Sequence, residues 1–126
     1  MKNSVLEIYE SATTRELSES EQEIIRKVIS ELDHGKIRVC EKIDSAWVTH
    51  EWIKKAILLF FKIQKNKVLD FEHWSYFDKL EVKKWNGSEG VRVVPPALAR
   101  VGSYIEKGAI LMPSYVNIGA YVGAGT

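Results

Sequence analysis

The last 26 residues constrain the fold more than any other part of the sequence. They contain only two charged residues, Glu106 and Lys107, and five of the eight glycines of the chain. A parallel β-helix built of hexapeptides requires a spacing of six, because each flat face directs one apolar side chain inward and turns the corner with small residues. Apolar residues recur with this spacing at Tyr104, Ile110, Val116 and Val122, and small residues at Gly102, Gly108, Ser114 and Ala120.

The alternative is a loop-rich β segment in which this spacing is coincidental. Coils of a β-helix stack on one another, so several are needed for stability. About four hexapeptides precede the end of the sequence at Thr126, and we therefore expect a truncated array. Pro95-Pro96 marks the predicted junction. The predicted fold class is α+β, with a helical and α/β domain over residues 1–96 and the start of the β-helix over residues 97–126.

Two segments of the first half carry helix signals. Ser4–Glu7 and Ser18–Glu21 both have the spacing of a capping box. The second is followed by an apolar stripe of period 3.6 that ends at Gly35, a residue suited to terminate a helix. Thr49 is expected to cap another helix, from about His50 to Gln64, which is predicted to be the central core element.

Short β-prone runs surround this helix. Asp44-Ser45 is expected to form a turn between two of them, at Ile37–Val39 and Trp47-Val48. Further strands or extended segments are predicted at Val68-Leu69, Tyr76-Phe77 and Leu80–Trp85.

Composition indicates a globular protein of the cytoplasm. Hydrophobic residues make up 45% of the chain and charged residues 28%, which argues against disorder. The longest apolar run, Ala56–Phe61, is too short to cross a bilayer, so no membrane association is expected. The single cysteine, Cys40, cannot form an internal disulfide and is expected to pack as a small apolar residue.

The charge is unevenly distributed. Residues 1–35 are acidic and residues 36–100 are basic, which solvated lysines explain most simply. The alternative is a non-catalytic module that binds nucleic acid, in which Trp52 and Trp74 would stack on bases. The lysines of that module would be Lys54, Lys55, Lys62, Lys65 and Lys67.

Few residues suggest chemistry by themselves. There is no phosphate-binding loop and no metal-ligand spacing, and His34, His50 and His73 are expected to be surface or capping residues. Arg92 lies just before the predicted junction, where a guanidinium can hold a substrate carboxylate with two hydrogen bonds. An ion pair with a carboxylate across the junction is an equally good interpretation of Arg92.

Residues 36–126 resemble the bacterial tetrahydrodipicolinate N-succinyltransferases, which are hexapeptide-repeat acyltransferases of lysine and diaminopimelate synthesis. The first 35 residues resemble the helical N-terminus of that family only in general character. The matching stretches are Arg38–Asp44, Trp47–Trp52, Tyr76–Lys79, Arg92–Ala97, Leu111–Val122 and Gly125-Thr126.

The resemblance implies a left-handed parallel β-helix and a homotrimer. It also implies transfer of a succinyl group from succinyl-CoA, the co-substrate, to the amino group of ring-opened tetrahydrodipicolinate, with no cofactor and no metal. Arg92 falls on the substrate-binding arginine of the family, whereas its acidic substrate-binding residue falls beyond Thr126, and the catalytic residues are unknown.

We therefore expect this chain alone not to catalyse the reaction. Besides the nucleic-acid module, two alternatives are another hexapeptide acyltransferase, with a sugar or a different amine as acceptor, and a fragment that only makes protein contacts.

Overall fold

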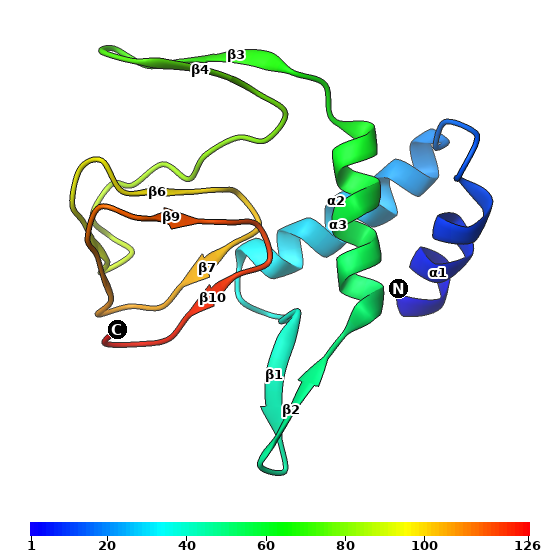
Figure 1. Cartoon of the computed structure of the whole chain (residues 1–126), viewed down its shortest axis with the longest axis horizontal. Helices are drawn as coiled ribbons and strands as arrows, with labels where there is room; N and C mark the ends of the chain where they lie inside the picture. Colours follow the sequence, from blue (N-terminus) through cyan, green and yellow to red (C-terminus); the bar gives the residue numbers. More distant parts are fainter.

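The computed structural model describes all 126 residues. Three helices lie on one side of the molecule and two successive turns of short strands on the other, while two hairpins project from the body (Figure 1). The helices and strand pairs agree with the predicted α+β class. The helices are α1 (Lys2–Ser11), α2 (Glu19–Asp33) and α3 (Glu51–Ile63).

The helix signals of the sequence are correct for α2. Ser18 and Glu21 form the predicted capping box, and Gly35 follows the helix with a φ of 69°. The other two predicted caps are wrong. Ser4 lies inside α1, which begins two residues earlier, and the N-cap of α3 is His50 because Thr49 is still the last residue of a strand.

Helix α3 contacts both α1 and α2, as expected for the central element of the core. Its buried residues are Ile53, Ala56 and Leu59, whereas Leu58 is 57% exposed, so part of the apolar surface of α3 remains uncovered. None of the three helices is long and apolar enough to cross a membrane.

The two hairpins are antiparallel. One consists of β1 (Cys40–Ile43) and β2 (Ala46–Thr49), and the other of β3 (Lys67–Asp70) and β4 (Ser75–Asp78). The predicted turn between β1 and β2 is confirmed, because Asp44 and Ser45 both have positive φ, as a two-residue type I′ turn requires.

Three expectations for the neighbouring segments need correction or refinement. Cys40 is exposed and not packed, because it begins a hairpin that projects from the body. The β-prone run at Ile37–Val39 forms no strand, because β1 begins after it at Cys40. Leu80–Trp85, predicted as a strand or an extended segment, forms only an isolated bridge between Val82 and Arg100.

The second half of the molecule consists of three parallel strand pairs. Val93 lies beside Leu111, Ala99 beside Val116, and Ile105 beside Val122. The chain thus makes two turns of three strands each, and the second turn stacks on the first. The strands are β5 (Arg92–Val93), β6 (Leu98–Ala99), β7 (Tyr104–Ile105), β8 (Ile110–Leu111), β9 (Tyr115–Val116) and β10 (Tyr121–Val122).

The predicted row of inward side chains is wrong at its first two members. Ile110 is 48% exposed, and Ile105 and Leu111 are buried where Tyr104 and Ile110 were expected. Successive inward residues are six positions apart except between Leu111 and Val116, which are five apart. The inward positions before Leu111 and after Val116 therefore differ by one residue in the period of six. The observed inward row is Val93, Ala99, Ile105, Leu111, Val116 and Val122.

The strand turns pack directly against the helices through two glycines. A Cβ at Gly102 would lie 2.6 Å from Ile118 and 3.3 Å from Ile29 of α2, and one at Gly119 would lie 2.9 Å from Ile57 of α3. Ile118 itself belongs to the helical core. Beside this contact, Asp33 Oδ1 at the end of α2 accepts hydrogen bonds from the Gly102 N–H at 2.7 Å and the Lys83 ammonium at 2.6 Å.

Replacement of Gly119 by alanine tests this close approach. The added Cβ meets Ile57 and Val39, and the φ of 86° is unfavourable for alanine. We expect Gly119→Ala to lower the free energy of unfolding by about 2–4 kcal/mol, from the left-handed backbone together with overpacking. The control is Gly87→Ala, where φ is 92° and no atom lies within 4 Å, and for which we expect a loss of about 1–2 kcal/mol. If urea titrations showed the same loss of unfolding free energy in both variants, the close contact of Gly119 with Ile57 and Val39 would not contribute to stability.

The ion pair at the start of α2 predicts a pH effect. Hydrogen bonds from the Arg15 guanidinium and from the Ser18 N–H lower the pKa of Glu21 to about 2. A carboxylate with a lowered pKa stabilises the fold above its unfolded pKa of roughly 4.3, and this contribution is lost as the pH falls toward the folded value. We expect the difference in Tm between the wild type and Glu21→Gln to be constant above about pH 5 and to shrink between about pH 4.5 and 2. A difference independent of pH would show that the charge of Glu21 does not contribute.

Candidate functional site

Arg92 lies on the outer surface of the strand turns. It begins β5 beside Ile110 of β8, and its backbone N–H donates to Ala109 O at 3.1 Å, while the guanidinium is exposed. The neighbouring Val93 packs toward the interior, as expected for alternating side chains in a strand. The side chain of Arg92 makes no hydrogen bond or ion pair within the chain. The ion pair across the junction, one of the two interpretations of Arg92, is therefore not found.

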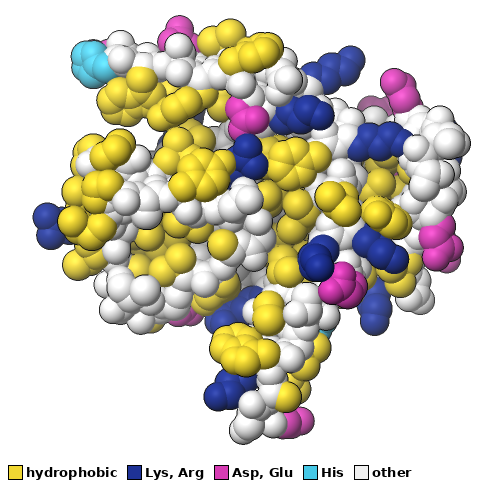
Figure 2. Space-filling model, in the orientation of Figure 1, with side chains coloured by type: hydrophobic (Ala, Val, Ile, Leu, Met, Phe, Trp, Pro, Cys, Tyr) yellow, Lys and Arg dark blue, Asp and Glu magenta, His cyan; other side chains and the backbone are white.

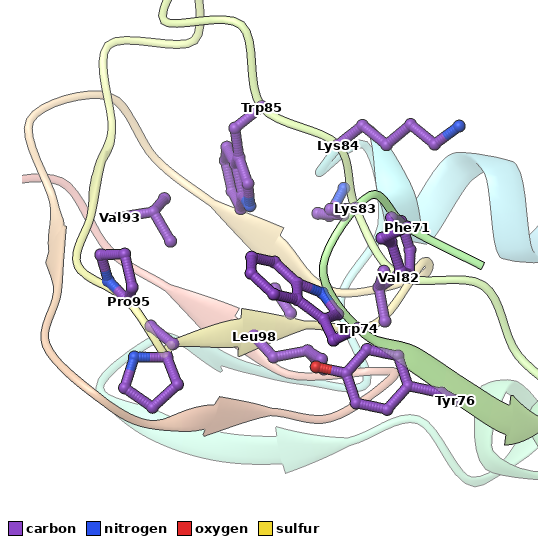
Figure 3. Close-up of a pocket in the computed structure, with 13 residues that line it drawn as sticks. Phe71, Trp74, Tyr76, Val82, Lys83, Lys84, Trp85, Val93, Pro95 and Leu98 are labelled. Atoms are coloured by element: carbon purple, nitrogen blue, oxygen red, sulfur yellow. The ribbon is translucent and has the colours of Figure 1, made fainter. Parts of the chain in front are cut away.

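A cleft lined by aromatic rings and prolines adjoins the same segment. It has a volume of about 420 Å³ and lies between the loop of the β3–β4 hairpin, the segment 82–85 and the first strand turn (Figure 3). Arg92 is not among the residues that line it, so the arginine and the cleft present separate surfaces. The labelled residues of its wall are Phe71, Trp74, Tyr76, Val82, Lys83, Lys84, Trp85, Val93, Pro95 and Leu98.

The two lysines of this cleft have different roles. Lys83 is engaged by Asp33 and is largely buried. Lys84 makes no hydrogen bond or ion pair, and its ammonium extends away from the rings of the cleft (Figure 3). The cleft therefore combines an apolar interior with one free positive charge at its edge.

Arg100 fixes the hairpin that forms one side of the cleft. Its guanidinium donates to Asp78 Oδ2 of β4 at 2.9 Å and to Asn117 Oδ1 at 3.2 Å. Desolvation opposes ionisation of Asp78, but the hydrogen bond from the Lys79 N–H and the charge of Arg100 outweigh it and lower the pKa of Asp78. The buried Arg100 Nε has no partner. This side chain thus joins the hairpin to the second strand turn.

A second network lies at the end of the chain. The Tyr121 hydroxyl donates to Glu106 Oε1 at 2.5 Å, and the Ala124 N–H donates to Oε2 at 2.6 Å. These two hydrogen bonds, with the charge of Arg38, lower the pKa of Glu106, whereas burial raises the pKa of Tyr121. A carboxylate with a lowered pKa is a weak base, so Glu106 is suited to hold the two turns together and not to accept a proton.

The histidines take positions at the ends of elements. His50 is the N-cap of α3, and its Nε2 lies 2.6 Å from Glu41 Oε1 of β1. His34 is the C-cap of α2, and its Nδ1 lies 2.7 Å from Ser30 O. The capping role is therefore confirmed for His34, whereas the His50 side chain makes no hydrogen bond to the end of α3 and contacts β1 instead.

The lysines of the nucleic-acid alternative are mostly engaged within the chain. Lys54 pairs with Glu51 and Lys67 with Glu81. Lys62 donates to the carbonyls of Ala12 and Arg15, and Lys55 lies over the ring of Tyr9. Four of the five lysines have partners, which does not favour a surface that binds phosphates.

Comparison with known proteins identifies the family. The family model described as the tetrahydrodipicolinate N-succinyltransferase N-terminal region matches residues 1–63, half of the chain. The chain belongs to this family. The match covers all three helices and the β1–β2 hairpin, including the segment 1–35 in which the sequence resembled the family only in general character.

Relatives extend the similarity into the strand turns. Proteins named 2,3,4,5-tetrahydropyridine-2,6-dicarboxylate N-succinyltransferase share 48% identity over 83% of this chain in Acinetobacter baylyi and 52% over 78% in Proteus mirabilis. A protein of the same name from Sodalis glossinidius is 47% identical over 91% of the chain. The chain matches only 38–42% of the length of these relatives.

The anchoring role of Arg100 can be tested by hydrogen exchange. We expect Arg100→Lys to increase amide exchange in β3 and β4 by about tenfold or more, because lysine cannot hold Asp78 and Asn117 together and a charged hydrogen bond contributes about 1.5–3 kcal/mol. The matched control is Arg26→Lys on α2, where the side chain bonds only to Gln22. Unchanged exchange in the hairpin of Arg100→Lys would show that packing alone holds it.

Proposed function

We propose that this chain supplies the N-terminal part of an enzyme that transfers a succinyl group from succinyl-CoA to the amino group of ring-opened tetrahydrodipicolinate. The observation that carries the proposal is the identity of about 50% to relatives with that enzyme name over most of the chain. The name of these relatives specifies a dicarboxylate acceptor and the succinyl group.

We infer that the two strand turns are the first coils of a left-handed parallel β-helix. Three parallel strand pairs, a registry of 17 or 18 residues between partners and an inward row of apolar side chains support this inference. In the complete enzyme, further coils would stack on the exposed edges of β8, β9 and β10, which otherwise invite aggregation.

Arg92 is the proposed substrate-binding residue. A dicarboxylate needs cationic partners, and the guanidinium of Arg92 is exposed and unpaired within the chain. Arginine binds a carboxylate through two parallel hydrogen bonds, which fixes the orientation of the substrate as well as its position. Its neighbour on the adjacent strand, the exposed and apolar Ile110, leaves its charge uncompensated until the substrate or another segment approaches.

The proposed reaction needs no covalent enzyme intermediate. The unprotonated amine of the substrate attacks the thioester carbonyl carbon, the new C–N bond forms, the C–S bond breaks, and the proton of the amine leaves as the thiol of CoA is released. The site must therefore position two substrates and stabilise an oxyanion. Arg92 contributes to positioning, and the homotrimer implied by the family provides the setting in which the rest of the site is assembled.

The test uses a chimaeric enzyme, because this chain matches only about 40% of each relative. We would replace the matching segment of the Acinetobacter baylyi protein by residues 1–126 and measure release of the CoA thiol from succinyl-CoA with the dicarboxylate acceptor. We expect turnover, and we expect Arg92→Ala to raise KM for the acceptor roughly tenfold to a hundredfold while KM for succinyl-CoA changes little.

The control for this experiment is Arg26→Ala, which removes an exposed arginine on α2. A folded chimaera that turns over with an unchanged acceptor KM in Arg92→Ala would assign Arg92 a structural role. Competition by sugars but not by 2-aminopimelate would favour the alternative, a hexapeptide acyltransferase with another acceptor. A folded chimaera without succinyl transfer would contradict the proposed function.

A further inference from the structure

The β1–β2 hairpin presents a large apolar side chain near its tip. Trp47 is 71% exposed, and its neighbours Ile43 and Val48 are 43% and 36% exposed. The hairpin projects from the body, and hydrophobic side chains are visible along the projection (Figure 2). A two-stranded hairpin is marginally stable by itself, and tryptophan is enriched among the residues that dominate protein interfaces.

The cleft beside Pro95 and Pro96 has the chemistry to receive such a side chain. Its volume of about 420 Å³ exceeds that of an indole ring, and nine of its 13 lining residues are hydrophobic. Trp74, Tyr76 and Trp85 offer ring faces and edges for stacking, which adds to the energy of apolar burial.

A chain cannot place its own Trp47 in its own cleft. The β1–β2 hairpin and the β3–β4 hairpin that borders the cleft project from opposite sides of the molecule (Figure 1). The register of both hairpins is fixed, and the helices and strand turns lie between them. Contact between the two features therefore requires a second copy.

Each of the two features carries one acidic and one basic side chain. The hairpin tip carries Asp44 and Lys42, and the edge of the cleft carries Lys84 and, next to Phe71, Glu72. None of these four side chains makes a hydrogen bond or an ion pair within its own chain. An acidic and a basic group on each side allow opposite charges to face one another when the hairpin approaches the cleft.

We propose that Trp47 of one copy inserts into the aromatic cleft of a second copy, so that identical chains assemble head to tail. The inference rests on the self-assembly included in the proposed function and specifies the surfaces that join the copies. Because the hairpin and the cleft are different surfaces, the contact is heterologous, and it closes into a ring when the rotation between copies permits. A homotrimer is one such ring.

The test is the association of the full 126-residue chain, measured by sedimentation equilibrium between 1 and 500 µM, a range chosen to bracket roughly micromolar association. We expect the wild type to form oligomers, and Trp47→Ala and Trp74→Ala each to weaken association by about 30-fold or more, as for residues that dominate an interface. Both side chains are more than half exposed, so their loss leaves the core intact. The control is Leu58→Ala on α3, which removes a similarly exposed apolar side chain outside both features.

A mixing experiment identifies the contact as heterologous. Trp47→Ala retains the cleft and Trp74→Ala retains the hairpin, so an equimolar mixture should form one-to-one dimers that neither variant forms alone. A wild type that stays monomeric throughout the range, or association unchanged in either variant, would overturn the proposal. Sedimentation does not depend on activity, so the two proposals can fail separately. If the chimaera is active but Trp47→Ala associates as strongly as the wild type, this inference is overturned and the proposed function stands.

Discussion

The fold depends on the close approach of the strand turns to the helices at Gly102 and Gly119. Without a Cβ at these corners, Ile118 of the second strand turn enters the helical core, while the interior of the strand turns forms a separate apolar cluster. Asp33 completes the junction, because one carboxylate oxygen receives both the Gly102 N–H and the Lys83 ammonium. Lys83 also lines the aromatic cleft, so the same junction that joins the two halves positions a wall of that cleft.

Features determined by neighbouring residues could be predicted from the sequence, whereas those set by long-range packing could not. The capping box at Ser18 and the turn at Asp44-Ser45 were correct, because each needs only a few adjacent residues. The row of inward side chains was predicted one residue too early at Ile110, where Leu111 points inward. The five-residue spacing between Leu111 and Val116 is seen only once the two turns are stacked. The exposure of Cys40 depends on where its hairpin projects, and alternation alone does not reveal this.

The candidate site shows the same division. Arg92 was singled out by its place just before the predicted junction, and the family resemblance favoured a substrate-binding role over an ion pair. The structure places it on an exposed face without an internal partner. The aromatic cleft was missed, since its walls come from three separate segments spread along the chain from Phe71 to Ala99. The exposed Trp74 and the Pro95-Pro96 pair were the available signals, but no spacing rule joins them.

The measurement that tests the central claim most directly is a crystal structure of the chimaeric enzyme with 2-aminopimelate bound. The account predicts a carboxylate of the ligand held by two hydrogen bonds from the Arg92 guanidinium, on the outer face of β5 beside Ile110. A bound ligand that leaves Arg92 in solvent, or paired with a carboxylate of the protein, would contradict it.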